Sequence, residues 1–384
     1  MAQLNGGFSL YKRSRKSGKP VYYAKIFDPK LVESEVRIST GQTSKTAAAL
    51  WTQAYMEDLA NEEQRKRDER LNITMKKFAE GFWDHDGEYA NSRRARLRTV
   101  SLGFLDNRAS LTKNHIIPYW GKYRLKDITA RKVDRWVIDM ASDNRNAPAS
   151  VNQRLQVLKV MLDDACRQEY LKENPAQYVK PVANKYRKKG VLSLDEVKEL
   201  LNYKIWPDYR QYAINLLTLA TGIRIGEVRG LLVSQVQPDH VQIHTSWEEN
   251  YGLKEPKCGS VRDLPISKYI YDVLQEVISS TGATNLVFYG KTLDTPMSKS
   301  YIEKSLYKAL KEIGIPESVR KQRNITFHSL RHTTNTIMRS VGIADSKVRM
   351  MTGHREESMT ERYTHFRLED FREIEHVQLM MVNQ

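Results

Sequence analysis

The sequence predicts a multidomain α+β protein, with a small three-stranded β-sheet and a helix at the N-terminus and a mostly α-helical remainder. The N-terminal segment contains short aromatic and β-branched runs between Gly, Pro and Ser turns, a pattern typical of strands. Later apolar residues recur with the 3.6-residue period of amphipathic helices. With 384 residues, 40% of them hydrophobic, the chain is long enough for two or three domains with separate cores.

The N-terminal segment, residues 1–65, is expected to form one domain of three strands followed by a helix. We expect the strands at residues 8–13, 21–27 and 35–40. Ser44 then provides an N-cap for an alanine-rich helix. From Asn61 onward the sequence is densely charged and has no apolar face, which favours a solvated linker.

Two further domains are expected, at residues 73–183 and 191–384, joined by a basic linker at 184–190. The middle domain should be helical, because its apolar residues follow a 3.6-residue period after candidate N-caps at Thr129 and Ser150.

The last domain is expected to be mostly helical, with a small antiparallel β-sheet inserted among the helices. Ser193 and Glu196 have the spacing of a capping box, and Gly222 is placed to end a helix in the left-handed conformation. Residues 240–247 alternate like a strand, and 257–267 resemble a turn and a return strand.

Charge and cysteine content narrow the classes of function. The chain has 62 Lys and Arg against 46 Asp and Glu, a formal net charge of +16, which favours nucleic acid as the partner. No apolar run approaches the length of a spanning helix and no signal-peptide pattern opens the chain, so we expect a cytoplasmic protein without a membrane partner. Cys166 and Cys258 lie far apart, which indicates neither a disulfide scaffold nor a thiolate metal site.

The stretch "TFHSLRHTTN", residues 326–335, concentrates imidazole and guanidinium groups in a chain with only nine histidines. On a helix, His328 could share a ligand with either Arg331 or His332. Two sites are therefore compatible with the spacing: a metal site made by the two histidines, or an anion site made by His328 with Arg331.

Four motifs in order resemble the signature of the tyrosine recombinases, the phage integrase family. They are "ATGIRIGEV" with Arg224, "HSLRH" with His328 and Arg331, "TGH" with His354, and "RYTH" with Tyr363. Arg331 and His354 are 23 residues apart and His354 and Tyr363 nine, as in that family. The resemblance favours the anion site over the metal site and implies that neither a metal nor another cofactor is required.

The resemblance also implies a catalytic lysine on a β-hairpin. In "EPKCGSVRDLPI" this position falls on Lys257, with Lys254 as the alternative. The following residue, Cys258, departs from the threonine of many relatives. The middle domain looks like the family's core-binding domain, and the first domain looks like the arm-binding domain of integrases encoded by mobile elements.

Phosphodiester chemistry calls for the same residue types. Arg224 and Arg331 suit the non-bridging oxygens, because a guanidinium donates two parallel hydrogen bonds and stays protonated. Tyr363 would be the nucleophile, near His328 and His354, and Lys257 would protonate the leaving 5′ oxygen. The resulting enzyme would form a 3′-phosphotyrosyl intermediate, with integration or excision of a mobile element as the outcome.

The resemblance implies several partners that composition does not show. Four copies would assemble as a homotetramer on double-stranded DNA with core and arm-type sites, and would exchange strands through a four-way Holliday junction. DNA-bending and directionality factors are compatible with this scheme. A bacterial host is implied, with the protein on nucleoid DNA in the cytoplasm.

Two other classes of function are compatible with some of these residues. One is a metal-dependent nuclease that uses His328, His332 and a carboxylate; the other is a non-catalytic DNA-binding regulator with a recombinase fold. Arg224 alone could simply pair with Glu227 at i+3, and Tyr363 alone could be a packing residue. The six residues taken together favour an active site.

The C-terminal tail, residues 366–384, is expected to be an amphipathic helix. Its apolar stripe comprises Leu368, Phe371, Ile374 and Val377. Packing on its own domain and packing on a neighbouring protomer are both compatible with this pattern.

Overall fold

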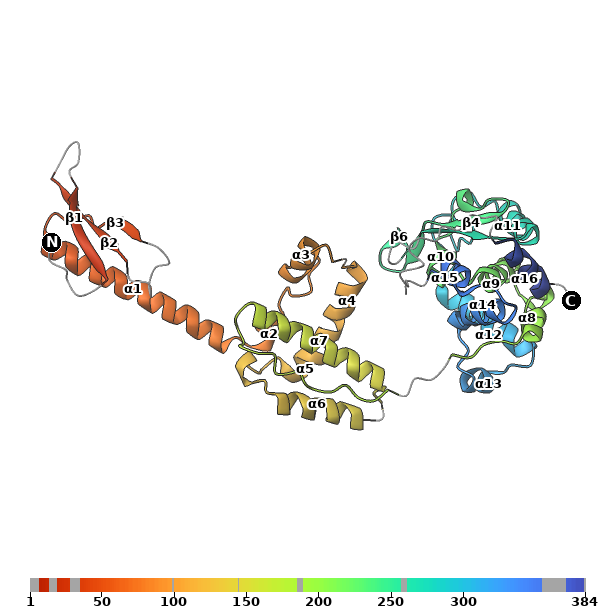
Figure 1. Cartoon of the computed structure of the whole chain (residues 1–384), viewed down its shortest axis with the longest axis horizontal. Helices are drawn as coiled ribbons and strands as arrows, with labels where there is room; N and C mark the ends of the chain where they lie inside the picture. The colour runs from red at the N-terminus through yellow and green to blue at the C-terminus, as the bar shows by residue number, and fades with distance from the viewer. Residues whose placement is uncertain are drawn as a thin grey trace. The chain divides into compact units, whose positions relative to one another are not determined.

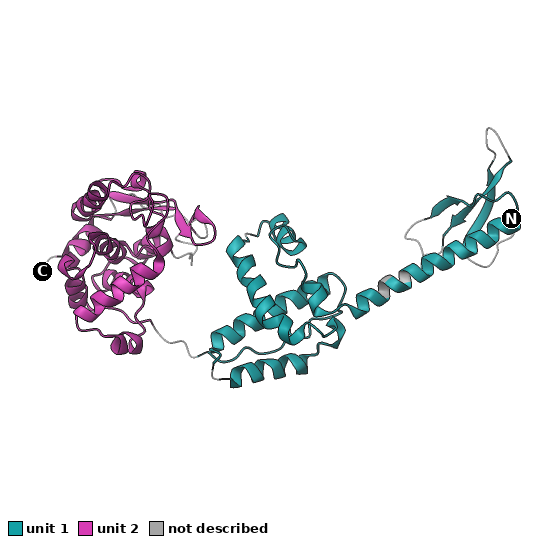
Figure 2. Cartoon of the chain, turned by 180° about the vertical axis from the view of Figure 1, so that it is seen from behind, with its two compact units in different colours: residues 1–185 teal, residues 186–384 magenta. Residues whose placement is uncertain are grey.

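The computed structural model describes residues 7–13, 19–27, 35–98, 100–143, 145–184, 189–256, 261–353 and 371–382, apart from the side chains of residues 63, 66 and 67 (Figure 1). The chain divides into two compact units, residues 1–185 and 186–384 (Figure 2). The division falls inside the stretch 184–190 in which the linker was expected. Within the described ranges, no helix is long and apolar enough to cross a membrane.

The first unit begins with the expected three-stranded antiparallel sheet, which is confirmed. Its strands, in spatial order, are β1 (Phe8–Arg13), β2 (Val21–Ile26) and β3 (Val36–Ser39). Helix α1 (Lys45–Asn72) starts at the predicted cap, where the Ser44 hydroxyl accepts the N–H of Ala47. Phe8 and Ile26 are buried with Tyr55 and Met56 of α1, so one face of the sheet is covered by the helix.

Helix α1 continues through the charged stretch from Asn61 and ends at Asn72. Glu, Gln, Lys and Arg are strong helix formers even where they face solvent. The side chain of Gln64 also donates to Asp68 one turn later, at 3.1 Å, and such pairs support exposed helices.

The rest of the first unit is helical, as predicted. Its elements are α2 (Met75–Ala79), α3 (Glu88–Ala95), α4 (Leu102–Leu111), η1 (Thr112–Ile116), α5 (Ile117–Trp120), η2 (Leu125–Asp127), α6 (Ala130–Ser142) and α7 (Pro148–Arg167). The Thr129 cap is confirmed, since its hydroxyl accepts the N–H of Lys132. The N-cap of α7 is Ala147, three residues before the expected cap at Ser150, and the helix begins at Pro148, because proline is well suited to the first turn of a helix.

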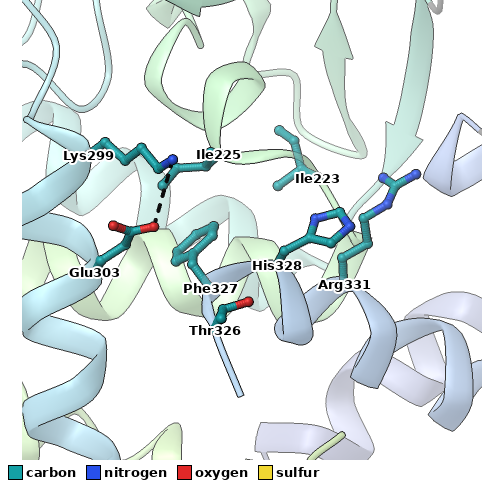
Figure 3. Close-up of a pocket in the computed structure, with 8 residues that line it drawn as sticks. All are labelled: Ile223, Ile225, Lys299, Glu303, Thr326, Phe327, His328 and Arg331. Atoms are coloured by element: carbon teal, nitrogen blue, oxygen red, sulfur yellow. Dashed lines mark ion pairs between the residues drawn. The ribbon is translucent and has the colours of Figure 1, made fainter. Parts of the chain in front are cut away.

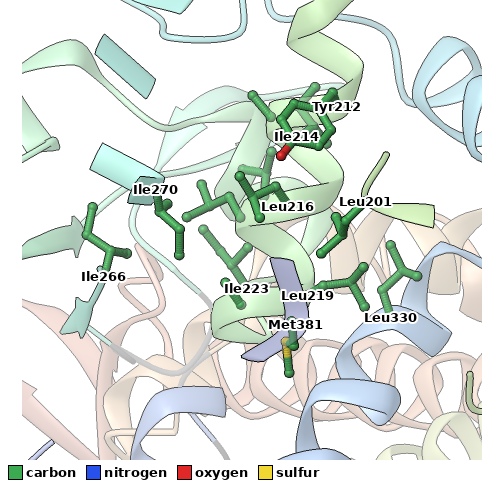
Figure 4. Close-up of a cluster of buried hydrophobic side chains, with 14 of the residues drawn as sticks. Leu201, Tyr212, Ile214, Leu216, Leu219, Ile223, Ile266, Ile270, Leu330 and Met381 are labelled. Carbon is green, nitrogen blue, oxygen red and sulfur yellow. The ribbon is translucent and has the colours of Figure 1, made fainter. Parts of the chain in front are cut away.

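The second unit surrounds one central helix, α9 (Tyr209–Thr221), in which all residues from Gln211 onward are buried. The other helices are α8 (Leu194–Leu200), η3 (Tyr203–Ile205), α10 (Ile225–Arg229), η4 (Val233–Gln235), α11 (Lys268–Thr281), α12 (Lys299–Glu312), α13 (Glu317–Gln322), α14 (Phe327–Ser340), α15 (Asp345–Thr352) and α16 (Arg372–Val382). Figure 4 shows Leu219 of α9 among buried side chains that include Leu330 of α14 and Met381 of α16. The capping box of Ser193 and Glu196 is confirmed.

The described strands of this unit form two small antiparallel sheets instead of one. Strand β4 (His240–Ile243) pairs with β7 (Arg262–Pro265), and β5 (Ser246–Glu248) pairs with β6 (Gly252–Lys254). The single strand expected over residues 240–247 is therefore two strands. The break lies beside Thr245, whose hydroxyl donates to the carbonyl of Gly230 at 2.6 Å and so turns the chain toward α10.

Helix α16 packs on its own unit, which is one of the two arrangements left open by the sequence. Ile374 and Val377 are buried in the common core. Between them and the C-terminus, the amide of Gln378 accepts the N–H of Ser267 at 2.7 Å and donates to the carbonyl of Pro265 at 3.0 Å. These buried hydrogen bonds fix the position of α16 on its own unit.

Candidate active site

Two glycines allow the C-terminal ends of α9 and α15 to meet. Gly222 follows α9 with φ +69°, and Gly353 follows α15 with φ +63°. A Cβ on Gly222 would lie 3.1 Å from Cγ2 of Thr352, and one on Gly353 would lie 3.3 Å from Nη1 of Arg224. Glycine is favoured at both positions by the left-handed backbone and by this close approach. The left-handed stop predicted at Gly222 is confirmed.

Arg224 lies at the start of α10 and faces the end of α15. Its Nη1 donates to Oε1 of Glu227 at 2.8 Å, and its Nη2 donates to the carbonyl of Gly353 at 2.9 Å. Its backbone N–H donates to Oε2 of Glu227 at 3.0 Å. The pairing with Glu227 does not hide the guanidinium, because the Arg224 side chain remains 31% exposed.

Arg331 reaches the same place from α14. Its Nη1 donates to the carbonyl of Gly222 at 2.6 Å, and its Nη2 donates to the carbonyl of Thr352. The carbonyls of Thr352 and Gly353 thus hold Arg331 and Arg224 side by side. This arrangement brings together two residues that are far apart in sequence, as the resemblance implies.

A third arginine, Arg262 on β7, completes the cluster and was missed in the sequence. Its Nη2 donates to Oε2 of Glu227 at 2.8 Å, and its Nε donates to the carbonyl of Met351 at 2.9 Å. The alternation of the strand could have indicated it, because Arg262 lies two residues before the buried Leu264 and therefore points to the same, inner face of the strand. A buried arginine needs a carboxylate or carbonyl partner, and the core of this unit supplies both.

Arg224 and Arg262 share the buried carboxylate of Glu227, and Arg331 is held by backbone carbonyls, so the site carries surplus positive charge. Burial alone would raise the pKa of Glu227, but hydrogen bonding to Arg262 and the charges of both neighbouring guanidinium groups outweigh it and lower that pKa. Burial, followed by the charges of Arg224 and Arg262, lowers the pKa of Arg331 to about 9. An anion bound here would remove this unfavourable repulsion, which is the behaviour expected of a phosphate site.

His328 lies one turn before Arg331 on α14 and is neutral at pH 7. Burial, then the neighbouring His332 and Arg331, lower the pKa of His328 to about 4. The ring of His332 meets that of His328 edge to face, with centroids 4.9 Å apart. His332 therefore contacts the predicted site residue.

Lys189 is a second residue that the site analysis of the sequence missed. It lies close enough to His328 and His332 to lower the pKa of both rings. The chain following Lys189 is held against the start of α14: a Cβ on Gly190 would lie 2.2 Å from the carbonyl oxygen of Arg323, and the N–H of Leu192 donates to the Thr333 hydroxyl at 3.0 Å. The only sequence signal was the basic character of residues 184–190.

The β5–β6 hairpin packs directly on α10, the helix that carries Glu227. A Cβ on Gly230 would lie 2.8 Å from the backbone nitrogen of Trp247 in β5. Lys254 lies opposite Ser246 at the open end of the hairpin and forms an ion pair with Glu248 on the neighbouring strand. Lys254 is thus engaged within the hairpin.

Three of the six predicted site residues, Lys257, His354 and Tyr363, lie outside the described residues. The other three, Arg224, His328 and Arg331, are brought together by α9, α10, α14 and α15. In the described part of the chain, no three His, Cys, Asp or Glu side chains are grouped so that they could hold a metal ion.

Comparison with known proteins gives consistent matches. Residues 190–369 match the phage integrase family. The tyrosine recombinase XerD of Oceanobacillus iheyensis is 24% identical over 288 residues, which cover 72% of this chain and 94% of the relative. A putative prophage phiRv2 integrase of Mycobacterium tuberculosis is 24% identical over 272 residues, which cover 66% of this chain and 68% of the relative.

Solved structures show the same fold. The Tn1549 transposon integrase in complex with transposon right-end DNA has a TM-score of 0.57 at 19% identity, covering 78% of this chain and 98% of that one. A lambda integrase dimer bound to a COC′ core site has a TM-score of 0.58 at 16% identity, covering 96% of this chain and 98% of that one. Residues 190–369 thus match the phage integrase family, and the relatives and solved structures together support a tyrosine recombinase.

Proposed function

We propose that this protein is a site-specific DNA recombinase that cuts and rejoins strands through a covalent 3′-phosphotyrosyl intermediate, and that it integrates or excises a mobile element. The observation that carries the proposal is the cluster of Arg224, Arg262 and Arg331 around one carboxylate, with the first and last held by adjacent carbonyls. In sequence those carbonyls directly precede His354, and Tyr363 follows nine residues later.

In this proposal each residue has one chemical task. Arg224 and Arg331 stabilise the non-bridging oxygens of the scissile phosphate, where charge develops in the transition state. Tyr363 loses its phenolic proton, attacks the phosphorus and forms the phosphotyrosyl bond as the bond from phosphorus to the 5′ oxygen breaks. Lys257 donates a proton to that leaving oxygen, so that a 5′ hydroxyl is released. His328 is neutral at pH 7, so it serves as a hydrogen-bonding group, and His354 acts beside it. Transesterification conserves the phosphodiester bond energy, so the residues suffice without ATP, metal or other cofactor.

The proposed assembly is a homotetramer on double-stranded DNA. A lambda integrase with the same fold is a tetramer bound to a Holliday junction, and the Tn1549 integrase was captured with circular intermediate DNA. Two successive strand exchanges between core sites would use four copies of this chain. We place the protein on nucleoid DNA in a bacterial cytoplasm, since the relatives named above are bacterial.

The proposed division of labour assigns residues 73–183 to core-site DNA, 191–384 to catalysis and 1–65 to arm-type DNA. The sheet supports the last assignment, because α1 covers only one face. Strand register places on the other face Tyr11, Arg13, Tyr23, Lys25 and Arg37. Cationic and aromatic side chains on a three-stranded sheet suit a DNA groove. Lys25 forms an ion pair with Glu35 at 2.5 Å, and this pair would have to break before Lys25 could bind a phosphate.

Deletion of residues 1–72, which ends where α1 ends, tests the arm assignment. The truncated protein should cleave an isolated core site as the full chain does, and should fail in integration that depends on a distal second site. Equal recombination of both kinds of substrate by the two proteins would contradict it.

Strand cleavage in EDTA tests the reaction class. Host DNA that stays attached to the protein after denaturation is sequenced to locate the attachment site, and recombination between two copies of that site is then measured. The proposal requires full activity in EDTA without ATP. Cleavage that appears only with added Mg²⁺ or Zn²⁺ would establish a metal-dependent nuclease instead.

A further inference from the structure

A pocket of about 210 Å³ adjoins the arginine cluster on the side of His328. Its walls come from the segment after α9, from the first turn of α12 and from the start of α14; the lining residues are Ile223, Ile225, Lys299, Glu303, Thr326, Phe327, His328 and Arg331. Figure 3 shows Lys299 and Glu303 on one side and His328 and Arg331 on the other. Arg331 thus belongs both to this pocket and to the proposed phosphate site.

Lys299 is held only loosely by its neighbour. Its Nζ lies 3.9 Å from Oε1 of Glu303, and its side chain is 56% exposed. By contrast, the ion pair of Arg224 with Glu227 measures 2.8 Å and its carboxylate is buried. Exposed pairs of the first kind contribute little stability, so the Lys299 ammonium can exchange its carboxylate for another anion at small cost.

The remaining lining is apolar. Ile223 and Phe327 are buried, at 1% and 3% exposure, and Ile225 lies beside them. The volume is below the roughly 300–1,000 Å³ of typical small-molecule pockets. A cationic rim, a neutral imidazole and an apolar floor of this size suit one sugar–phosphate unit better than a separate cofactor.

We propose that this pocket binds the nucleotide next to the scissile phosphate on the strand being cut, with its phosphodiester on Lys299 and its deoxyribose against Ile225 and Phe327. Successive phosphates of one strand follow each other at about 3.4 Å of helix rise. A pocket that shares Arg331 with the scissile phosphate is therefore well placed for the adjacent phosphate. The inference rests on the proposed recombinase function.

Equilibrium binding to attachment-site DNA at several salt concentrations tests the contact. Lys299→Gln should weaken binding and reduce the slope of log K against log salt by about one. Glu303→Gln should strengthen binding, because it removes the competing carboxylate. Lys304→Gln is the matched control: it removes an equal charge from an exposed position of the same helix that does not line the pocket, and it should leave the slope unchanged.

Neutral methylphosphonates placed one at a time along the cut strand locate the contact. At the phosphate next to the cleavage point, the methylphosphonate should weaken DNA binding by the unchanged protein. It should not weaken DNA binding by the Lys299→Gln variant any further. At all other positions, the effects of the two changes should add.

The outcomes separate this inference from the function on which it rests. If the unchanged protein binds DNA with a steep salt slope and Lys299→Gln keeps that slope, the pocket assignment alone is overturned. It is also overturned if Lys299→Gln and the neighbouring methylphosphonate weaken binding additively. A flat salt slope for the unchanged protein would overturn both the recombinase function and this inference.

Discussion

Arg224 binds the carboxylate of Glu227 twice, through its guanidinium at 2.8 Å and through its own backbone N–H at 3.0 Å. This double contact fixes both the side chain and the first turn of α10. Because Arg262 binds the same carboxylate, Glu227 holds two of the three arginines of the cluster.

Replacing Glu227 should therefore be costly. Glu227→Ala leaves Arg262 buried without its counter-charge, and we expect a loss of about 3–5 kcal/mol in the free energy of unfolding, measured in urea. Glu317→Ala removes a carboxylate that pairs with Lys321 on the surface, and should leave the free energy of unfolding nearly unchanged, because exposed ion pairs contribute little. Equal losses for the two variants would contradict the role assigned to Glu227.

Gly222 should be required for activity beyond its effect on stability. Gly222→Ala and Gly282→Ala both place alanine in a left-handed conformation, at φ +69° and +66°, which costs roughly 1–2 kcal/mol. The new methyl group has open space at Gly282 but lies 3.1 Å from Thr352 at Gly222, against the turn that holds Arg331. Cleavage rates measured well below the melting temperature should fall only for Gly222→Ala; a matching fall for Gly282→Ala would show that stability alone decides.

His328 should make the protein sensitive to acid. Its pKa is about 4 in the folded protein and about 6.5 in the unfolded chain, so the unfolded state binds more protons between these values. The stability contribution is complete above pH 6.5 and is lost as the pH falls toward 4. The melting temperature of His328→Asn should therefore decline less than that of the unchanged protein over this window, and parallel declines would show that His328 titrates normally.

Lys257 and Lys254 can be told apart by a substrate with sulfur at the 5′ bridging position. The 5′ oxygen needs a proton in order to leave, because the alcohol it forms has a pKa near that of water, about 15.7. A thiol has a pKa of about 8.5, so sulfur can leave as the thiolate without a proton donor. Lys257→Ala should be severely impaired on ordinary DNA and largely restored on the sulfur substrate, while Arg224→Ala and Arg331→Ala stay impaired on both. Restoration of Lys254→Ala in place of Lys257→Ala would move the general acid to Lys254.

Much of the fold follows from local sequence patterns. Ser44, Thr129 and the pair Ser193 and Glu196 cap helices where their spacing indicates, and Gly222 ends α9 in the left-handed conformation. These features depend on residues within one helical turn, so short-range rules are sufficient. The N-cap of α7 lies three residues before Ser150, because Pro148 in the first turn outweighs Ser150 as a cap.

The parts of the site that the sequence did not reveal depend on long-range packing. Arg262 joins the cluster through Glu227, 35 residues away, and through the carbonyl of Met351, 89 residues away. Lys189 reaches the histidines only because the chain after it is held against the start of α14. Lys299 of α12 and His328 of α14 line the same pocket. The periodicity within either helix does not indicate this neighbourhood.

The most direct test of the account is the covalent bond to Tyr363. The full chain is incubated in EDTA with attachment-site DNA nicked beside the cleavage point, so that the cut fragment diffuses away, and the denatured product is digested and analysed by mass spectrometry. The account predicts a 3′-phosphodeoxynucleotide on Tyr363, absent from Tyr363→Phe. A nucleotide on another residue, or cleaved DNA without any covalent adduct, would contradict it.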